Sequence, residues 1–294
     1  MSVQTSPARR AELPAIAAGV TTVVLWASAF VGIRDAGADL SGGPLALGRL
    51  LVASLVLGAF VLARRERLVP RDDLPGLLVC GLLWFAVYNV ALNEAERRVD
   101  AGTAAMLVNI GPILIALLAG RLLGEGFPRT LLTGCAIAFA GVVVIGVATS
   151  SEGLTASWGT ALCLVAALTY AAGVIAQKPL LEHSSALAVT WLACSVGALA
   201  CLPFAPALVE QLGDAEGSSI AWMVYLGIFP TALAFTTWAY ALARSSAGRM
   251  GALTYFVPPL AILMGWALLD EVPPTLALAG GVLSITGAAI ARRR

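Results

Sequence analysis

Long apolar runs separated by short polar segments fill almost the whole chain. Each run has about the 20 residues that a helix needs to cross the hydrocarbon core of a membrane. The polar segments between them hold most of the charges and many of the prolines that end helices. The pattern predicts ten membrane-spanning helices, at Leu13–Ile33, Gly43–Ala63, Leu74–Glu96, Ala101–Leu122, Phe127–Val147, Ser157–Gln177, Ser185–Phe204, Ile220–Ala243, Ala247–Leu269 and Thr275–Ala291.

Composition supports an all-α membrane protein without a separate soluble domain. Of the 294 residues, 59% are hydrophobic and 12% charged, whereas soluble domains carry about a quarter charged residues. The net charge of +1 offers no basic surface for nucleic acid. The five cysteines lie in apolar stretches without a CxxC motif, and His183 is the single histidine, so we expect no metal site. The sequence has no ATP-binding loop motif either, and we expect no cofactor.

The basic residues predict the orientation of the helices. Alternate loops place fourteen Lys and Arg on one side and three on the other, with Arg49 inside the second predicted helix. Positive charge marks the cytoplasmic side, so both termini are expected in the cytoplasm, at the inner (plasma) membrane. Arg9, Arg10 and the run Ala27–Ala29 also fit a cleavable signal peptide. The apolar run continues beyond that point to Ile33, which favours a spanning helix.

The chain contains an internal repeat. A shift of 146 positions aligns residues 101–141 with 247–287, and 13 of the 41 pairs are identical, Pro112 with Pro258 and Glu125 with Glu271 among them. Residues 1–149 and 150–294 are therefore predicted to be two copies of one five-helix unit. An odd number of helices forces the second copy into the membrane upside down, which is the arrangement that many secondary transporters use for alternating access.

Several segments resemble the drug/metabolite transporter superfamily, in its bacterial ten-helix branch with two EamA-like domains. They follow the family order along nearly the whole chain: Trp26–Phe30, Ala46–Leu50, Asp100–Leu107 through Pro112 to Glu125, Tyr225–Gly227, Thr231–Ala234 and Pro258–Glu271. The resemblance implies a secondary carrier, often an exporter, of small metabolites such as amino acids. It also implies a central cavity formed by helices one, three, four, six, eight and nine.

Two prolines occupy equivalent places in the middle of predicted helices. Pro112 and Pro258 must each interrupt the helical hydrogen bonds, which predicts a bend that could gate a carrier. One turn earlier lie Asn109 and Tyr255, which also correspond in the repeat and could bind a substrate. A structural kink with a polar neighbour explains the same pattern, so both interpretations stay open.

The third predicted helix carries a polar stripe. Asn89, Asn93 and Glu96 share one helical face, which Tyr88 borders. Lipid would leave their polar atoms unsatisfied, so the stripe lines a cavity or packs against another helix. Arg49 near the outer end of the second helix either reaches the interface or provides the counter-charge of a substrate carboxylate.

Two further features have structural explanations. Glu125 and Glu271 end predicted helices, and we expect each to cap the helix that follows it. Gly120 and Gly124 form a small-residue motif that makes a homodimer a candidate state.

These features favour an ATP-independent carrier of a neutral or zwitterionic, amino-acid-like small molecule. The alternatives are a proton-coupled multidrug antiporter, an integral-membrane enzyme, and a membrane module that transports nothing. Glu96 and Arg49 are the candidates for coupling, and Pro112 and Pro258 for gating. The predicted substrate-binding residues are Trp26, Tyr88, Asn89, Asn93, Asn109, Tyr170, Trp238 and Tyr255.

Overall fold

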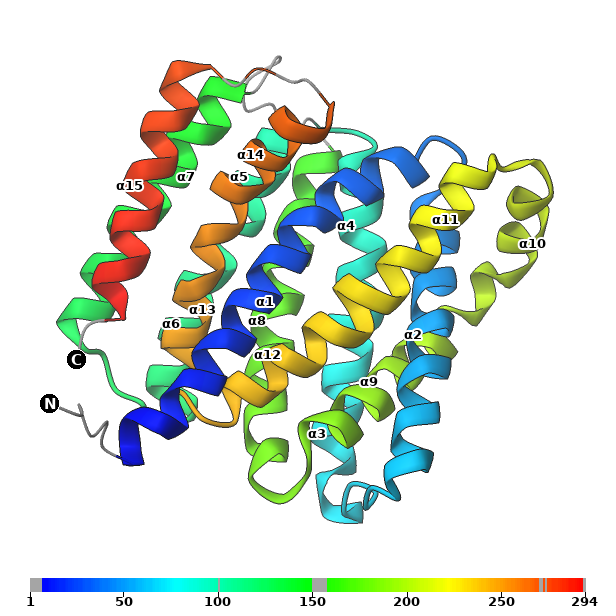
Figure 1. Ribbon diagram of the computed structural model, residues 1–294, viewed down its shortest axis with the longest axis horizontal. Helices are drawn as coiled ribbons and strands as arrows, with labels where there is room; N and C mark the ends of the chain where they lie inside the picture. The colour runs from blue at the N-terminus through cyan, green and yellow to red at the C-terminus, as the bar shows by residue number, and fades with distance from the viewer. Residues whose placement is uncertain (1–6, 100, 150–157, 270–271, 273, 293–294) are drawn as a thin grey trace, which may run out of the picture.

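The computed structural model describes the chain except residues 1–6, 100, 150–157, 270–271, 273 and 293–294 (Figure 1). Helices make up its regular structure, and the described part contains no strand. The helices are α1 (Pro7–Ala36), α2 (Gly42–Arg64), α3 (Leu74–Cys80), α4 (Tyr88–Glu96), α5 (Ala101–Val108), α6 (Gly111–Leu122), α7 (Arg129–Thr149), α8 (Trp158–His183), α9 (Ala186–Ala200), α10 (Ala205–Asp214), α11 (Gly217–Leu226), α12 (Ala234–Leu242), α13 (Ala247–Leu253), α14 (Val257–Leu269) and α15 (Thr275–Ala291).

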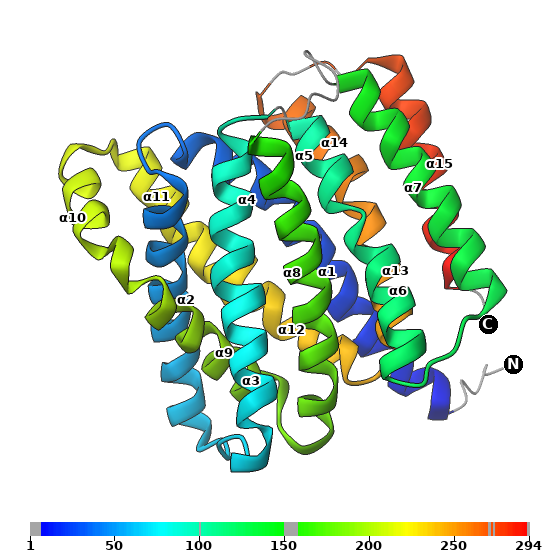
Figure 2. The same cartoon turned by 180° about the vertical axis from the view of Figure 1, so that it is seen from behind.

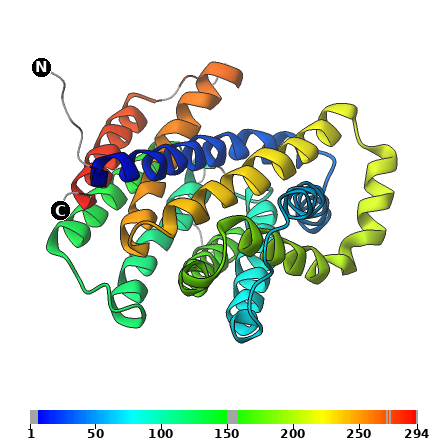
Figure 3. The same ribbon diagram turned by 60° about the horizontal axis from the view of Figure 1, so that its bottom comes forward.

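The helices form one bundle that runs between two ends. Helix α1 begins and α15 ends at the same end, here called the termini end, and the opposite end is the far end (Figures 1 and 3). Helices α7 and α15 form a pair along one flank, and α2, α9 and α10 lie on the other flank (Figures 1 and 2). Between the flanks, α1 packs against α11, α12 and α14, and α8 packs against α4 and α6.

Seven helices in the described part are long and apolar enough to cross a membrane. The bent pair formed by α9 and α10 would make an eighth span. Two more of the predicted spans contain shorter apolar helices, at Met106–Leu122 and Thr275–Ala291. The structure thus supports a multi-pass membrane protein, and the number of ten spans stays a prediction.

The seventh predicted span differs from the structure. We expected one helix over Ser185–Phe204, but α9 ends at Ala200 and the chain bends by 50° into α10. Pro203 and Pro206 follow the end of α9, and proline cannot donate the hydrogen bonds that would continue a straight helix. The polar side chains of α10 include Gln211, whose amide oxygen accepts from the Ser41 nitrogen at 2.9 Å. The segment between the seventh and eighth predicted spans therefore contains a helix, α10, which packs on the α1–α2 connection.

Two wide helical turns interrupt the third and eighth predicted spans at matching positions. The π-helix Gly81–Val87 joins α3 to α4, and the π-helix Gly227–Leu233, 146 residues later, joins α11 to α12. Such turns are uncommon and concentrate at functional sites. The same sequence shift that aligns the second parts of the two halves therefore also relates these irregular turns.

The prolines of the repeat lie where the structure breaks its helices, as expected. Helix α5 ends at Val108, and α6 starts with Gly111 and Pro112. In the second half, a tight helical turn at Thr254–Phe256 separates α13 from α14, and Pro258 is in the first turn of α14. A short stretch that ends two residues before each proline is thus outside regular α-helix in both halves.

Helices α7 and α15 pack in opposite directions through glycines. A Cβ atom on Gly141 would come within 2.6 Å of the Gly280 carbonyl oxygen, and one on Gly287 within 2.6 Å of the Gly134 carbonyl oxygen. The two contacts are equivalent in the repeat. Gly141 of α7 corresponds to Gly287 of α15, and Gly134 of α7 corresponds to Gly280 of α15, with 146 residues between the members of each pair. Equivalent helices that pack antiparallel in this way are related by a local two-fold axis perpendicular to them.

Candidate functional site: a central cavity and a vestibule

A small cavity lies in the middle of the bundle, toward the far end. Its volume is about 60 Å³, well below the roughly 300–1,000 Å³ of pockets that enclose drug-sized ligands. Five of the eight predicted substrate-binding residues line it, together with Arg49 and Pro112. The lining is Trp26, Ala29, Phe30, Ile33, Arg49, Trp84, Tyr88, Asn89, Leu92, Val108, Asn109, Pro112, Tyr170, Phe235, Thr254 and Val257.

Aromatic side chains from four spans meet on one side of this cavity. The Trp26 ring is 5.1 Å from the Trp238 ring and 5.3 Å from the Phe235 ring, between ring centres. Trp84 is 4.9 Å from Phe235 and 5.5 Å from Tyr170. These distances are typical of favourable aromatic pairs. The five rings, here called the aromatic cluster, fill the centre of the bundle and keep the cavity small.

Arg49 is the cation in the cavity lining. Its residue is 3% exposed, and its Nε atom donates to the Thr231 hydroxyl at 3.0 Å. Thr231 lies in the π-helix Gly227–Leu233, and its hydroxyl donates in turn to the Leu226 carbonyl oxygen at 2.7 Å. The π-helix of the second half therefore fixes the guanidinium of the first half beside the cavity. Thr231 could not be predicted from the sequence, because the sequence does not show which residue lies opposite Arg49.

The polar lining residues have defined partners or neighbours. The Asn89 amide nitrogen donates to the Phe85 carbonyl oxygen at 2.8 Å and to that of Trp84 at 3.3 Å. These carbonyls belong to the π-helix Gly81–Val87, so Asn89 supports that turn while its side chain borders the cavity. Tyr88, Asn109, Tyr170 and Thr254 also belong to the polar part of the wall.

Three predicted binding residues lie outside the cavity lining. The Asn93 amide nitrogen donates to the Gly42 carbonyl oxygen at 3.3 Å, so this side chain packs against the first turn of α2. Tyr255 is fully buried in the cluster that contains α7 and α15, where its carbonyl oxygen accepts from Ser284 at 2.8 Å. Trp238 belongs to the aromatic cluster, on the side away from the cavity.

Glu96 lies beside the site, at the far end of α4. Its side chain is close enough to Arg34 and Arg49 to interact with both charges. One of its carboxylate oxygens is buried without a hydrogen-bond partner among the described residues. The carboxylate does not line the cavity, so any role in coupling would act through these arginines.

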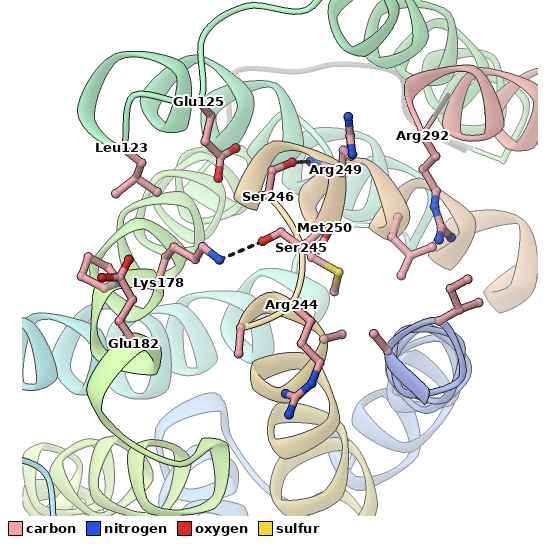
Figure 4. A pocket seen from close by; sticks show the side chains of 16 residues that line it. Leu123, Glu125, Lys178, Glu182, Arg244, Ser245, Ser246, Arg249, Met250 and Arg292 are labelled. Carbon is pink, nitrogen blue, oxygen red and sulfur yellow. Dashed lines mark hydrogen bonds between the residues drawn. The ribbon is translucent and has the colours of Figure 1, made fainter. Parts of the chain in front are cut away.

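A second and larger space opens at the termini end (Figure 4). This vestibule has a volume of about 1000 Å³ and combines apolar side chains with six charged ones. Lys178 extends across it, and its Nζ atom donates to the carbonyl oxygens of Leu242 and Ser245 at 2.8 Å each. The charged lining residues are Glu125, Lys178, Glu182, Arg244, Arg249 and Arg292.

Glu125 caps a different helix from the one predicted. Its carboxylate accepts from the backbone nitrogens of Ala247 at 2.5 Å and Gly248 at 3.0 Å, in the first turn of α13. The prediction that it caps the following helix is wrong, because the start of α13 lies closer in space than sequence order suggests. Glu271 lies outside the described residues.

The described residues form an apolar helical bundle with a central cavity and a vestibule at one end, an architecture that fits a membrane transporter. The model of the EamA-like transporter family matches the chain twice, over residues 13–147 and 157–293. The chain belongs to this family, within the drug/metabolite transporter superfamily.

Relatives with more specific names support the same class. The chain is 40% identical to a "Probable terminal-alkyne amino-acid exporter" of Streptantibioticus cattleyicolor, over 95% of this chain and 94% of the relative. It is 27% identical to a "Probable amino-acid metabolite efflux pump" of Salmonella typhimurium, over 90% of each chain. One crystal structure shares the fold with a TM-score of 0.77 and 23% identity, over 95% of this chain and 96% of the other.

Proposed function

We propose that this chain exports small amino acids with apolar side chains, in their zwitterionic form, across the inner membrane. The observation that carries the proposal is Arg49, a buried guanidinium in the wall of a cavity whose other lining residues are uncharged. A buried cation is costly in a membrane unless it has a partner. A substrate carboxylate would be such a partner.

The contacts of Arg49 suit this role. Its Nε atom is occupied by Thr231, which leaves the two terminal amino groups for a carboxylate. Tyr88, Asn89 and Asn109 offer oxygen atoms to an ammonium group, and the rings of Trp26 and Trp84 offer contacts to an apolar side chain. The cavity of about 60 Å³ is too small for such a substrate, so the aromatic cluster must move to admit it.

We further propose alternating access by two inverted halves, with both termini in the cytoplasm. The antiparallel pairing of α7 with α15 and the matching π-helices support this arrangement. The excess of Lys and Arg in the predicted cytoplasmic segments supports the orientation. A reporter that is active only outside the cytoplasm should be silent after Arg294 and active near Asp214; activity after Arg294 would contradict it.

Names of relatives favour export of amino acids. The relative from Streptantibioticus cattleyicolor is named for terminal-alkyne amino acids, and that from Salmonella typhimurium for amino-acid metabolites. Amino acids carry an α-carboxylate, which would pair with Arg49. L-Propargylglycine and L-leucine are therefore suitable first probes.

Counterflow in proteoliposomes tests the proposal. Vesicles preloaded with L-leucine or L-propargylglycine should accumulate the same radiolabelled amino acid, and Arg49→Gln should abolish this. Isopentylamine, which is leucine without its carboxyl group, should not be transported. Arg64→Gln, at the exposed other end of α2, is the matched control and should behave as wild type. Transport of tetraphenylphosphonium without transport of either amino acid would favour a multidrug antiporter instead.

A further inference from the structure

Two buried polar side chains on the vestibule side of the central cavity lack hydrogen-bond partners in the described part of the chain. Gln177 is fully buried, and both its amide nitrogen and its amide oxygen lack a partner in the described part of the chain. The indole nitrogen of Trp238, also fully buried, lacks one too. Buried groups without hydrogen bonds are destabilising and call for an explanation.

Their location connects the two spaces. Gln177 directly precedes Lys178, and Trp238 is one helical turn before Ala241; Lys178 and Ala241 both line the vestibule. The two helices meet here, because Lys178 donates to the Leu242 carbonyl oxygen. On the other side, the Trp238 ring is 5.1 Å from the ring of Trp26, which lines the central cavity.

The internal repeat relates both residues to the cavity lining. Trp238 lies 146 residues after Leu92, the same shift that relates the two π-helices. Gln177 lies 144 residues after Ile33. This slightly different shift aligns the weaker first parts of the two halves and also places Arg34 opposite Lys178. Leu92 and Ile33 line the cavity on its side toward the far end. In the repeat, Gln177 thus corresponds to Ile33, and Trp238 corresponds to Leu92. Gln177 and Trp238 lie toward the termini end, whereas Ile33 and Leu92 lie toward the far end.

We propose that Gln177 and Trp238 form a second substrate subsite, which lines the path when the vestibule extends inward to the aromatic cluster. The inference rests on the proposed function for its ligand, a zwitterionic amino acid. The Gln177 amide nitrogen and the Trp238 indole nitrogen donate to the carboxylate there. The Gln177 amide oxygen accepts from the α-ammonium group. The substrate would thus meet one set of polar groups near the termini end and another, around Arg49, near the far end.

Sided labelling tests the location without any knowledge of the substrate. Gln177→Cys and Ile33→Cys are treated with a membrane-impermeant maleimide in inside-out and right-side-out vesicles. The wild-type protein is the control, since its five cysteines are buried and Cys163 lies on the same helix as Gln177. Gln177→Cys should be labelled at least tenfold faster than wild type, from the side of the termini only, and Ile33→Cys from the opposite side. Labelling of Gln177→Cys as slow as that of wild type, or from the side that labels Ile33→Cys, would overturn the proposal.

Removal of the polar group tests the role. Leucine has a volume similar to that of glutamine. If the Gln177 amide has no role in transport, Gln177→Leu should leave transport unchanged and keep or raise the thermal stability. If Gln177 binds the substrate, the same variant should keep or raise the thermal stability, but its counterflow of L-leucine should fall at least tenfold. Normal counterflow in Gln177→Leu would exclude the subsite. If the wild type moves neither L-leucine nor L-propargylglycine, the proposed function fails, while the labelling result still decides whether Gln177 lines a path.

Discussion

The carboxylate of Glu125 accepts a hydrogen bond from the backbone nitrogen of Gly248, 123 residues away in the chain. Glu125 follows α6 of the first half, and Gly248 is in the first turn of α13 of the second half. A carboxylate at a helix N-terminus satisfies free N–H groups and interacts favourably with the helix dipole. The contact therefore joins the two halves at the termini end, beside the vestibule.

Glu125→Ala should lower the thermal stability of the purified protein, because it leaves the Ala247 and Gly248 nitrogens unpaired. Loss of a helix cap costs about 0.5–2 kcal/mol. Glu125→Gln keeps one acceptor and should fall between Ala and wild type. Glu182→Ala, an exposed glutamate in the same vestibule, is the control, and an equal loss in that variant would contradict a specific capping role.

The glycines between α7 and α15 predict a pair of equal effects. Gly141→Ala and Gly287→Ala each place a methyl group within 2.6 Å of a carbonyl oxygen on the facing helix, so both should lower the melting temperature. Gly281→Ala, in the same α15, meets nothing closer than 3.5 Å, at Pro259. It should leave stability unchanged or slightly higher, because alanine favours helix. Normal stability in the first two variants would refute the close packing.

Thr231→Val should weaken substrate binding through Arg49. The valine has a similar shape but cannot accept from the Arg49 Nε atom, so the guanidinium is no longer held toward the cavity. A hydrogen bond to a charged group contributes about 1.5–3 kcal/mol, which corresponds to a rise in KM of about tenfold or more. Thr231→Ser should restore the wild-type KM. A fall in kcat with KM unchanged would show that Thr231 serves the π-helix rather than Arg49.

Pro112→Ala and Pro258→Ala should slow transport more than they reduce the amount of protein in the membrane. Each alanine can restore a helical hydrogen bond at a break, which stiffens equivalent points of the two halves. Counterflow rates should be divided by the amount of protein in the vesicles. Normal rates in both variants would mean that the breaks are structural kinks only.

The sequence was sufficient for the features that depend on local pattern. Hydrophobic runs predicted the long helices, and Pro112 and Pro258 predicted the breaks, because proline acts on its own helix. Features that depend on a distant partner were not predictable. The stripe of Asn89 and Asn93 allowed a cavity or a packing contact, and the structure places one residue in each environment. The π-helix Gly81–Val87 precedes both residues and changes the helical phase of the earlier part of this span, which periodicity cannot reveal.

The same limit applies to residues that correspond in the repeat. Asn109 and Tyr255 are equivalent in sequence, yet Asn109 lines the cavity and Tyr255 packs between α13 and the α7–α15 pair. Two copies of a repeat need not place equivalent residues in the same environment. Arg49 shows the same dependence on distant residues, because its hydrogen-bond partner Thr231 lies 182 residues away.

Glu96→Gln decides between a facilitator and a proton-coupled antiporter. Proton coupling requires a group that gains and loses a proton during transport, and Glu96 is a carboxylate beside the site, near Arg34 and Arg49. Because Glu96 does not line the cavity, we expect counterflow of L-leucine in the Gln variant to stay within about twofold of wild type. Asp35→Asn, an exposed acid near the same end, is the control. Loss of transport driven by a pH gradient in Glu96→Gln alone would identify a proton-coupled carrier. Loss of tetraphenylphosphonium binding in that variant would point to a multidrug antiporter.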